Sequence, residues 1–134
     1  MKRLACAASA LAVLVLAAGA DNAETATAKQ LMNTLHKGAN APLTRLKTAL
    51  KSETPDWKTV QDASKELVVL GEGLPKTEPS RGDKAQYEKL ATSYYDDARA
   101  LDDAAKVEDK SQAQAALGKL GASCKTCHTA HKGK

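Results

Sequence analysis

The side chains with the clearest potential for chemistry lie near the C-terminus, where Cys124, Cys127 and His128 belong to the pentapeptide Cys-Lys-Thr-Cys-His. This C-x-x-C-H pattern is typical of c-type haem attachment. Two thiols at this spacing can add across the two vinyl groups of one haem, and the adjacent imidazole can then bind the iron from the proximal side. Because residues three and four apart share one side of a helix, a helix would present all three groups together.

Two other chemistries fit the same segment. A C-x-x-C pair can act as a redox dithiol, but no alternation of strands and helices surrounds this one. With His131 added, Cys124, Cys127 and His128 could instead bind zinc. The export signal and the thin core described next favour one covalently attached haem c. A small exported zinc or dithiol protein without haem remains as the second alternative.

The first twenty residues are interpreted as a secretory signal peptide. Lys2 and Arg3 precede an apolar stretch, and Ala18-Gly19-Ala20 is a small-residue cleavage site before Asp21. The stretch is at the short end for spanning a bilayer, so we expect cleavage and no stable membrane insertion. The prediction is a signal peptide at residues 1–20 and a single periplasmic domain at residues 21–134.

Removing this segment changes what the composition means. The whole chain is 43% hydrophobic but only 3% aromatic. The expected mature chain keeps twelve Leu, four Val, three Tyr, one Trp and one Met as its large apolar residues. So few large apolar residues argue against a β-sandwich or barrel and predict a small helical domain with a thin core.

The net charge falls from +4 to +2 without Lys2 and Arg3. We interpret the charges as interspersed on solvated helix faces, and we expect no nucleic-acid partner.

Apolar residues recur at intervals of three and four, which predicts an all-α fold, an antiparallel four-helix bundle. We expect the first helix to start near Thr25 and to be broken or kinked near Pro42. Thr54 is the predicted N-cap of the second helix and Asp83 that of the third. The fourth is expected to begin at Glu108 or Asp109. Its stripe consists of Ala113, Leu117, Leu120, Cys124, Cys127 and His131, so a haem attached there would face the bundle interior.

An exported helical domain of this size with C-x-x-C-H in its last helix resembles the class II cytochromes c, the cytochromes c′ and their low-spin relatives. The resemblance implies one haem c held between helices, with thioethers to Cys124 and Cys127 and with His128 as the proximal iron ligand. The family usually has an aromatic residue three residues after the ligand histidine and an arginine directly after that aromatic residue. This chain has His131 and Lys132 at these positions. We interpret His131 as a solvated residue near the chain end; a role beside the proximal imidazole is the alternative.

The resemblance also bears on the distal side of the iron. Low-spin relatives use a methionine of the first helix within a Lys-Leu-Met-like run, and Lys29-Gln30-Leu31-Met32 is similar to it. We predict Met32 as the distal ligand. The alternatives are His36, one turn later, and an open or apolar distal side.

The occupant of the distal position separates the functional hypotheses. A protein ligand there favours electron transfer with other exported redox proteins, whereas an open position lets the iron bind nitric oxide or carbon monoxide. We favour electron transfer and expect no enzyme activity. The resemblance also allows a homodimer.

Overall fold

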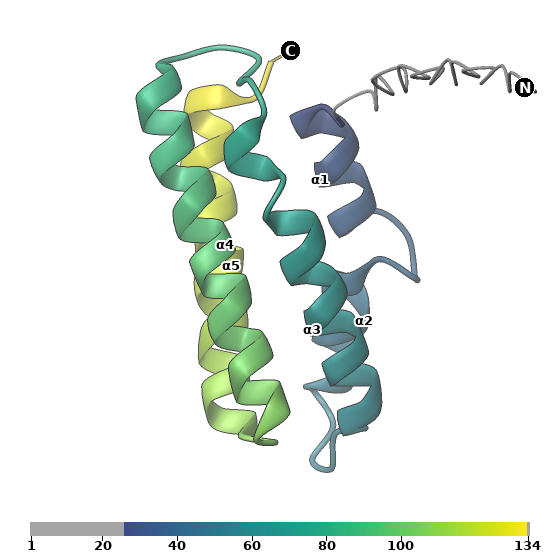
Figure 1. The fold of residues 1–134 in the computed structure, drawn as a ribbon. Coiled ribbons are helices and arrows are strands. Elements are labelled where there is room, and N and C mark those ends of the chain that lie inside the picture. The colour runs from purple at the N-terminus through teal and green to yellow at the C-terminus, as the bar shows by residue number, and fades with distance from the viewer. Residues whose placement is uncertain (1–25, 134) are drawn as a thin grey trace, which may run out of the picture.

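The computed structural model describes residues 26–133, and every regular element in this range is helical (Figure 1). The elements are α1 (Ala28–His36), α2 (Pro42–Ala49), α3 (Trp57–Gly71), the 3-10 turn η1 (Leu74–Lys76), α4 (Lys84–Lys106) and α5 (Lys110–His131). The prediction of an all-α fold is confirmed. The predicted signal peptide at residues 1–20 lies outside the described residues.

The break predicted near Pro42 is present, because α1 and α2 are separate helices and Pro42 is the first residue of α2. Its fixed φ angle suits that position. The turn before it contains Gly38 at a φ of 95°, which glycine adopts without strain. α1 begins slightly later than expected: the Thr27 hydroxyl accepts from the Gln30 backbone N–H, and the Gln30 side chain accepts from the Thr27 N–H.

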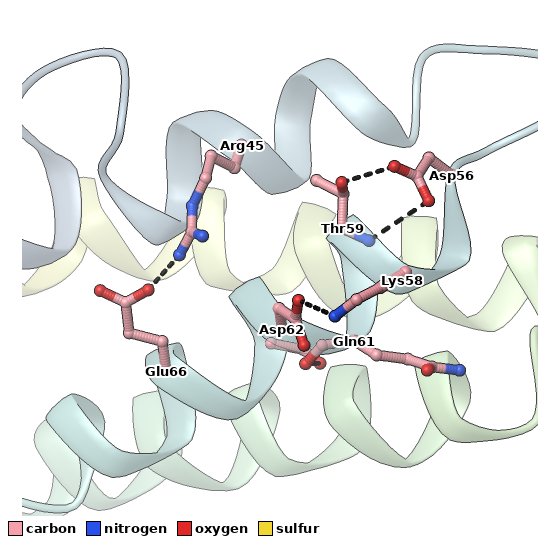
Figure 2. A network of polar contacts seen from close by, with 8 residues as sticks. Arg45, Asp56, Lys58, Thr59, Gln61, Asp62 and Glu66 are labelled. Atoms are coloured by element: carbon pink, nitrogen blue, oxygen red, sulfur yellow. Dashed lines mark hydrogen bonds and ion pairs between the residues drawn. The ribbon is translucent and has the colours of Figure 1, made fainter.

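One predicted boundary is wrong. Asp56 rather than Thr54 caps α3, and its carboxylate accepts from the backbone N–H and the hydroxyl of Thr59 (Figure 2). A carboxylate at the positive end of the helix dipole is a stronger acceptor than a hydroxyl, which explains the difference. The other two starts are as predicted, with Asp83 capping α4 and Asp109 capping α5.

The helices pack in two groups that meet along α3 and α4. α4 and α5 form a helical hairpin, while α2 packs on α3, and α1 packs on α2 and α3. Figure 1 shows α1 at the same end of the molecule as the C-terminal part of α5, on the other side of the α3–α4 contact. The predicted distal and proximal residues therefore lie at one end of the bundle.

The buried core is as thin as the composition predicts. Among the described residues, 19 hydrophobic side chains are buried, and eight of them are alanines. On α5, burial stops at Leu120 and resumes only at His131. The stretch between them carries the C-x-x-C-H segment, and only the partly buried Cys127 packs against the core from this part of the helix.

Candidate haem-attachment site

Two free thiols lie one turn apart on α5. Cys124 and Cys127 are both half-buried, and neither is in a disulfide. The Cys124 Sγ lies 3.3 Å from the carbonyl oxygen of Leu120, to which it donates a weak hydrogen bond. Burial, and then the neighbouring Cys124, raise the pKa of the Cys127 thiol. Two accessible thiols in this arrangement fit the two thioether bonds of a haem c.

His128 follows directly on the same helix and is exposed. We expected the three motif residues on or beside the buried stripe of the last helix. The cysteines lie at its edge and the histidine lies outside it. The reason is that α5 packs mainly on α4, whereas α1 packs on α2 and α3. The imidazole is thus available to a ligand rather than engaged in the core.

Two buried tyrosines of α4 border the motif. Burial, with a smaller contribution from Cys124, raises the pKa of Tyr94 far above its usual range. Burial also raises the pKa of Tyr87, and a charge on Cys127 adds to that increase. The two rings, seven residues apart on one side of the helix, each lie near one cysteine. The spacing of Tyr87 and Tyr94 is typical of one side of a helix, but no sequence pattern connects these rings with the C-x-x-C-H segment.

α1 brings His36 to the same region. His36 is half-buried, and its Nε2 lies 3.4 Å from the hydroxyl oxygen of Tyr94. Its pKa is lowered first by burial and then by the positive charges of Lys47 and His128. Met32, one turn earlier on α1, is half-buried and packs against the hydrophobic core. Residues of α1, α4 and α5 therefore converge around the C-x-x-C-H segment.

The interpretation of His131 as a solvated end residue is wrong. Its side chain is only 4% exposed and packs edge-on against the ring of Tyr87, with 5.5 Å between the ring centroids. Its Nδ1 lies 3.0 Å from the carbonyl oxygen of Arg81, and the Arg81 guanidinium donates to the Thr129 carbonyl oxygen at 2.7 Å. The loop before α4 thereby holds the last turn of α5, three residues after His128.

This position of His131 also bears on the zinc alternative. Its imidazole is buried and turned toward Arg81, whereas His128 is exposed. Within residues 26–133, no group of three or more His, Cys, Asp or Glu side chains could hold a metal ion. The four side chains of the hypothetical zinc site are thus not gathered around one point.

Two surface cavities lie elsewhere. One of about 400 Å³ lies between α3 and α4, and one of about 380 Å³ lies beside α1 and α3. Neither is lined by a residue of the C-x-x-C-H segment. In the described part of the chain, no helix is both long and apolar enough to cross a bilayer.

Residues 82–132, which include α4, α5 and the C-x-x-C-H segment, match the family model described as Cytochrome C′. This match covers the C-terminal part of the chain and supports its resemblance to the class II cytochromes c. The cofactor of a class II cytochrome c is one covalently attached haem c, which the free thiols and the available imidazole of α5 suit. No curated protein and no solved structure matches the chain significantly.

Proposed function

We propose that this chain is a class II cytochrome c that acts as an exported, periplasmic electron-transfer protein, with His128 as the proximal iron ligand. The supporting observation is the convergence of two helices with ligand side chains. The Nε2 of His36 on α1 lies 3.4 Å from the hydroxyl oxygen of Tyr94 on α4, and α4 packs along α5, which carries His128. Two ligands from opposite sides would fill both axial positions of the iron, and a six-coordinate iron favours electron transfer over gas binding.

The residues around the motif have separable roles in this proposal. Cys124 and Cys127 hold the cofactor covalently, and the haem supplies an iron that cycles between its ferric and ferrous states. The buried rings of Tyr87 and Tyr94 keep water away from the α4 side of the attachment segment. His131 fixes the last turn of α5 through the carbonyl oxygen of Arg81, which orients the helix that carries His128.

The distal ligand comes from α1. Met32 remains our prediction, because Lys29-Gln30-Leu31-Met32 is similar to the run that holds the distal methionine in low-spin relatives. A thioether ligand opposite a histidine would raise the reduction potential of the iron. The contact between His36 and Tyr94 supports His36 as the alternative, since it lies at the site and its lowered pKa favours the neutral, ligating form. The two side chains lie on the same side of α1, one turn apart, and only one of them is needed.

The same contact supports a second candidate function. If His36 Nε2 stays in contact with the Tyr94 hydroxyl oxygen, at 3.4 Å, when haem is bound, the imidazole is a polar group on the distal side and not an iron ligand. It could then donate a hydrogen bond to nitric oxide or carbon monoxide on an open iron position. The protein would in that case be a gas-binding cytochrome c′.

Absorption spectra distinguish these functions. The protein is produced in a host with cytochrome c maturation and recorded in the oxidised form, in the reduced form, and reduced under carbon monoxide. We expect a low-spin reduced spectrum that carbon monoxide leaves unchanged. A high-spin spectrum that shifts with carbon monoxide would support the gas-binding function instead. A protein without a Soret band would leave the zinc or dithiol alternative. The intact mass should equal residues 21–134 plus one haem.

Two substitutions then identify the distal ligand. Met32→Leu keeps the side-chain volume and removes the sulfur, so we expect it to give a high-spin protein that binds carbon monoxide. His36→Gln is the matched variant, and it should leave the low-spin spectrum in place. The reverse pattern would assign the ligand to His36. Thr34→Ala, at an exposed position of the same helix, controls for general damage to α1.

A further inference from the structure

Charged residues are divided unequally among the helices. Residues 26–52, which contain α1 and α2, include five basic residues and no acidic one. Residues 110–133, which contain α5, include four basic residues and no acidic one. Residues 53–109 include eight basic and fourteen acidic residues. The interpretation of the charges as interspersed is therefore wrong at the scale of whole elements. The nine basic residues of α1, α2, α5 and their flanks are Lys29, Lys37, Arg45, Lys47, Lys51, Lys110, Lys119, Lys125 and Lys132.

The lysines of the central segment are largely neutralised by neighbours. Lys58 pairs with Asp62 at 2.7 Å (Figure 2), and other lysines there pair with carboxylates in the same way. Arg45 of α2 is also paired, with Glu66 of α3 (Figure 2). In contrast, none of the eight lysines in residues 26–52 and 110–133 lies within ion-pair distance of a described carboxylate. Their positive charge is thus presented to the solvent.

Several of these lysines lie beside the candidate site. Lys125 is inside the C-x-x-C-H segment, and Lys132 is the first residue after α5, four residues beyond His128. Lys37 is the first residue after α1 and directly follows His36. All three lysines are exposed. We call the lysines of residues 26–52 and 110–133 together the basic surface. These lysines belong to α1, α2, α5 and their flanks, and two of these helices, α1 and α5, carry the predicted distal and proximal residues.

We propose that the basic surface is where an acidic region of the redox partner docks. The proposal rests on the proposed electron-transfer function. The expected mature chain has a net charge of only +2, and the two haem propionates bring it close to zero. The net charge therefore gives little attraction at long range, whereas a local cluster of one sign steers a complementary partner to one orientation.

An acidic protein fits this surface better than an anionic membrane does. A helix that binds a membrane surface combines basic residues with an exposed apolar face. The exposed large hydrophobic side chains of the described residues are Val69 on α3 and Val107 after α4. Neither belongs to α1, α2 or α5, so the basic surface lacks an apolar anchor beside it.

The test measures the local charge at the point of electron exchange. The ferrous holoprotein is oxidised in a stopped-flow instrument by hexacyanoferrate(III), an anion, or by tris(phenanthroline)cobalt(III), a cation, each of which accepts one electron. Raising the ionic strength from about 10 mM to about 500 mM shortens the Debye length from roughly 30 Å to below 5 Å. We expect the rate with the anion to fall on the order of tenfold and the rate with the cation to rise. Rates independent of salt would overturn the proposal.

Charge-matched variants separate the local field from the net charge. Lys37→Glu with Lys132→Glu changes the basic surface, whereas Lys65→Glu with Lys89→Glu makes the same net change at exposed positions of α3 and α4. We expect the first pair to slow oxidation by the anion by roughly tenfold and the second by less than about twofold. Equal effects of the two pairs would contradict docking at the basic surface.

A membrane is tested separately with vesicles of phosphatidylglycerol and phosphatidylcholine. Vesicle binding that Lys37→Glu with Lys132→Glu abolishes, without an effect on the oxidation rates, would assign the surface to lipid and overturn the proposal. Failure of the proposed function has another signature, a reduced spectrum that shifts under carbon monoxide. Both reagents can oxidise a five-coordinate or a six-coordinate haem, so the rates report the local charge in either case.

Discussion

At the scale of single residues, the end of α5 is held by contacts that its own sequence does not suggest. His131 is buried because Tyr87 covers its ring and the Arg81 carbonyl oxygen meets its Nδ1. Gly82, the next residue of the loop, has a φ of 84°. An added Cβ there would lie 2.8 Å from both the Ala130 carbonyl oxygen and His131 Nδ1. The close approach of this loop to α5 therefore requires glycine.

We predict that Gly82→Ala lowers the free energy of unfolding of the holoprotein by about 2 to 3 kcal/mol. The left-handed backbone costs a residue with a Cβ about 1 kcal/mol or more, and the clash with a backbone oxygen adds to it. Denaturant unfolding followed by circular dichroism measures the change. Gly118→Ala is the control: a Cβ at this position of α5 meets nothing within 4 Å, so stability should rise by about 0.5 to 1 kcal/mol. A neutral Gly82→Ala would contradict the proposed close fit.

At the scale of elements, the turn between α4 and α5 sets the hairpin that carries the site. The Asp109 N–H donates to the Ala104 carbonyl oxygen at 2.9 Å and the Glu108 N–H to the Ala105 carbonyl oxygen at 3.1 Å. These are the two hydrogen bonds of a Schellman motif, whose left-handed residue is usually glycine. Here that residue is Glu108, with a φ of 56°. The hairpin thus forms around a residue that is not optimal for its backbone.

We expect Glu108→Gly to raise the free energy of unfolding by roughly 0.5 to 1 kcal/mol, because it relieves the left-handed strain. Thermal unfolding of the holoprotein should show a melting temperature higher by a few degrees. Val107→Gly is the matched control in the same turn. Val107 has an ordinary φ of −99°, so glycine there should lower the stability by adding freedom to the unfolded chain. An equal response at both positions would exclude relief of strain as the cause.

The helices themselves were largely predictable from sequence, because their signals are local. The stripe spacing and Pro42 predicted the elements and the break, and Asp83 was identified as a cap from its neighbours alone. One failure is local: Asp56, two residues after Thr54, caps α3 through its contacts with Thr59. The other failure involves a contact between distant segments. The burial of His131 depends on a loop fifty residues away, which no local pattern reports.

At the scale of the whole molecule, the buried core is thinnest beside the candidate site. Large buried hydrophobic side chains lie mainly in α2, α3 and α4, whereas α1 contributes only Leu35 and residues 121–130 of α5 contribute none. This stretch and α1 flank the candidate site. The composition showed that bulk was missing, but only the packing shows that it is missing beside the C-x-x-C-H segment. A covalently held haem would supply apolar area where the chain supplies least.

The last prediction follows from this uneven core. Replacing both thiols, Cys124→Ser with Cys127→Ser, gives a chain that cannot hold haem covalently. We expect its melting temperature to be lower by roughly 10 °C or more, the shift that about 2 kcal/mol produces in a domain of this size. Hydrogen exchange should accelerate most in α1 and in residues 121–130, because their buried contacts are fewest. α3 is the internal control, since Val60, Ala63 and Leu67 keep it in the core. A cooperative melt at the temperature of the holoprotein, with uniform protection, would show that the chain alone completes its core.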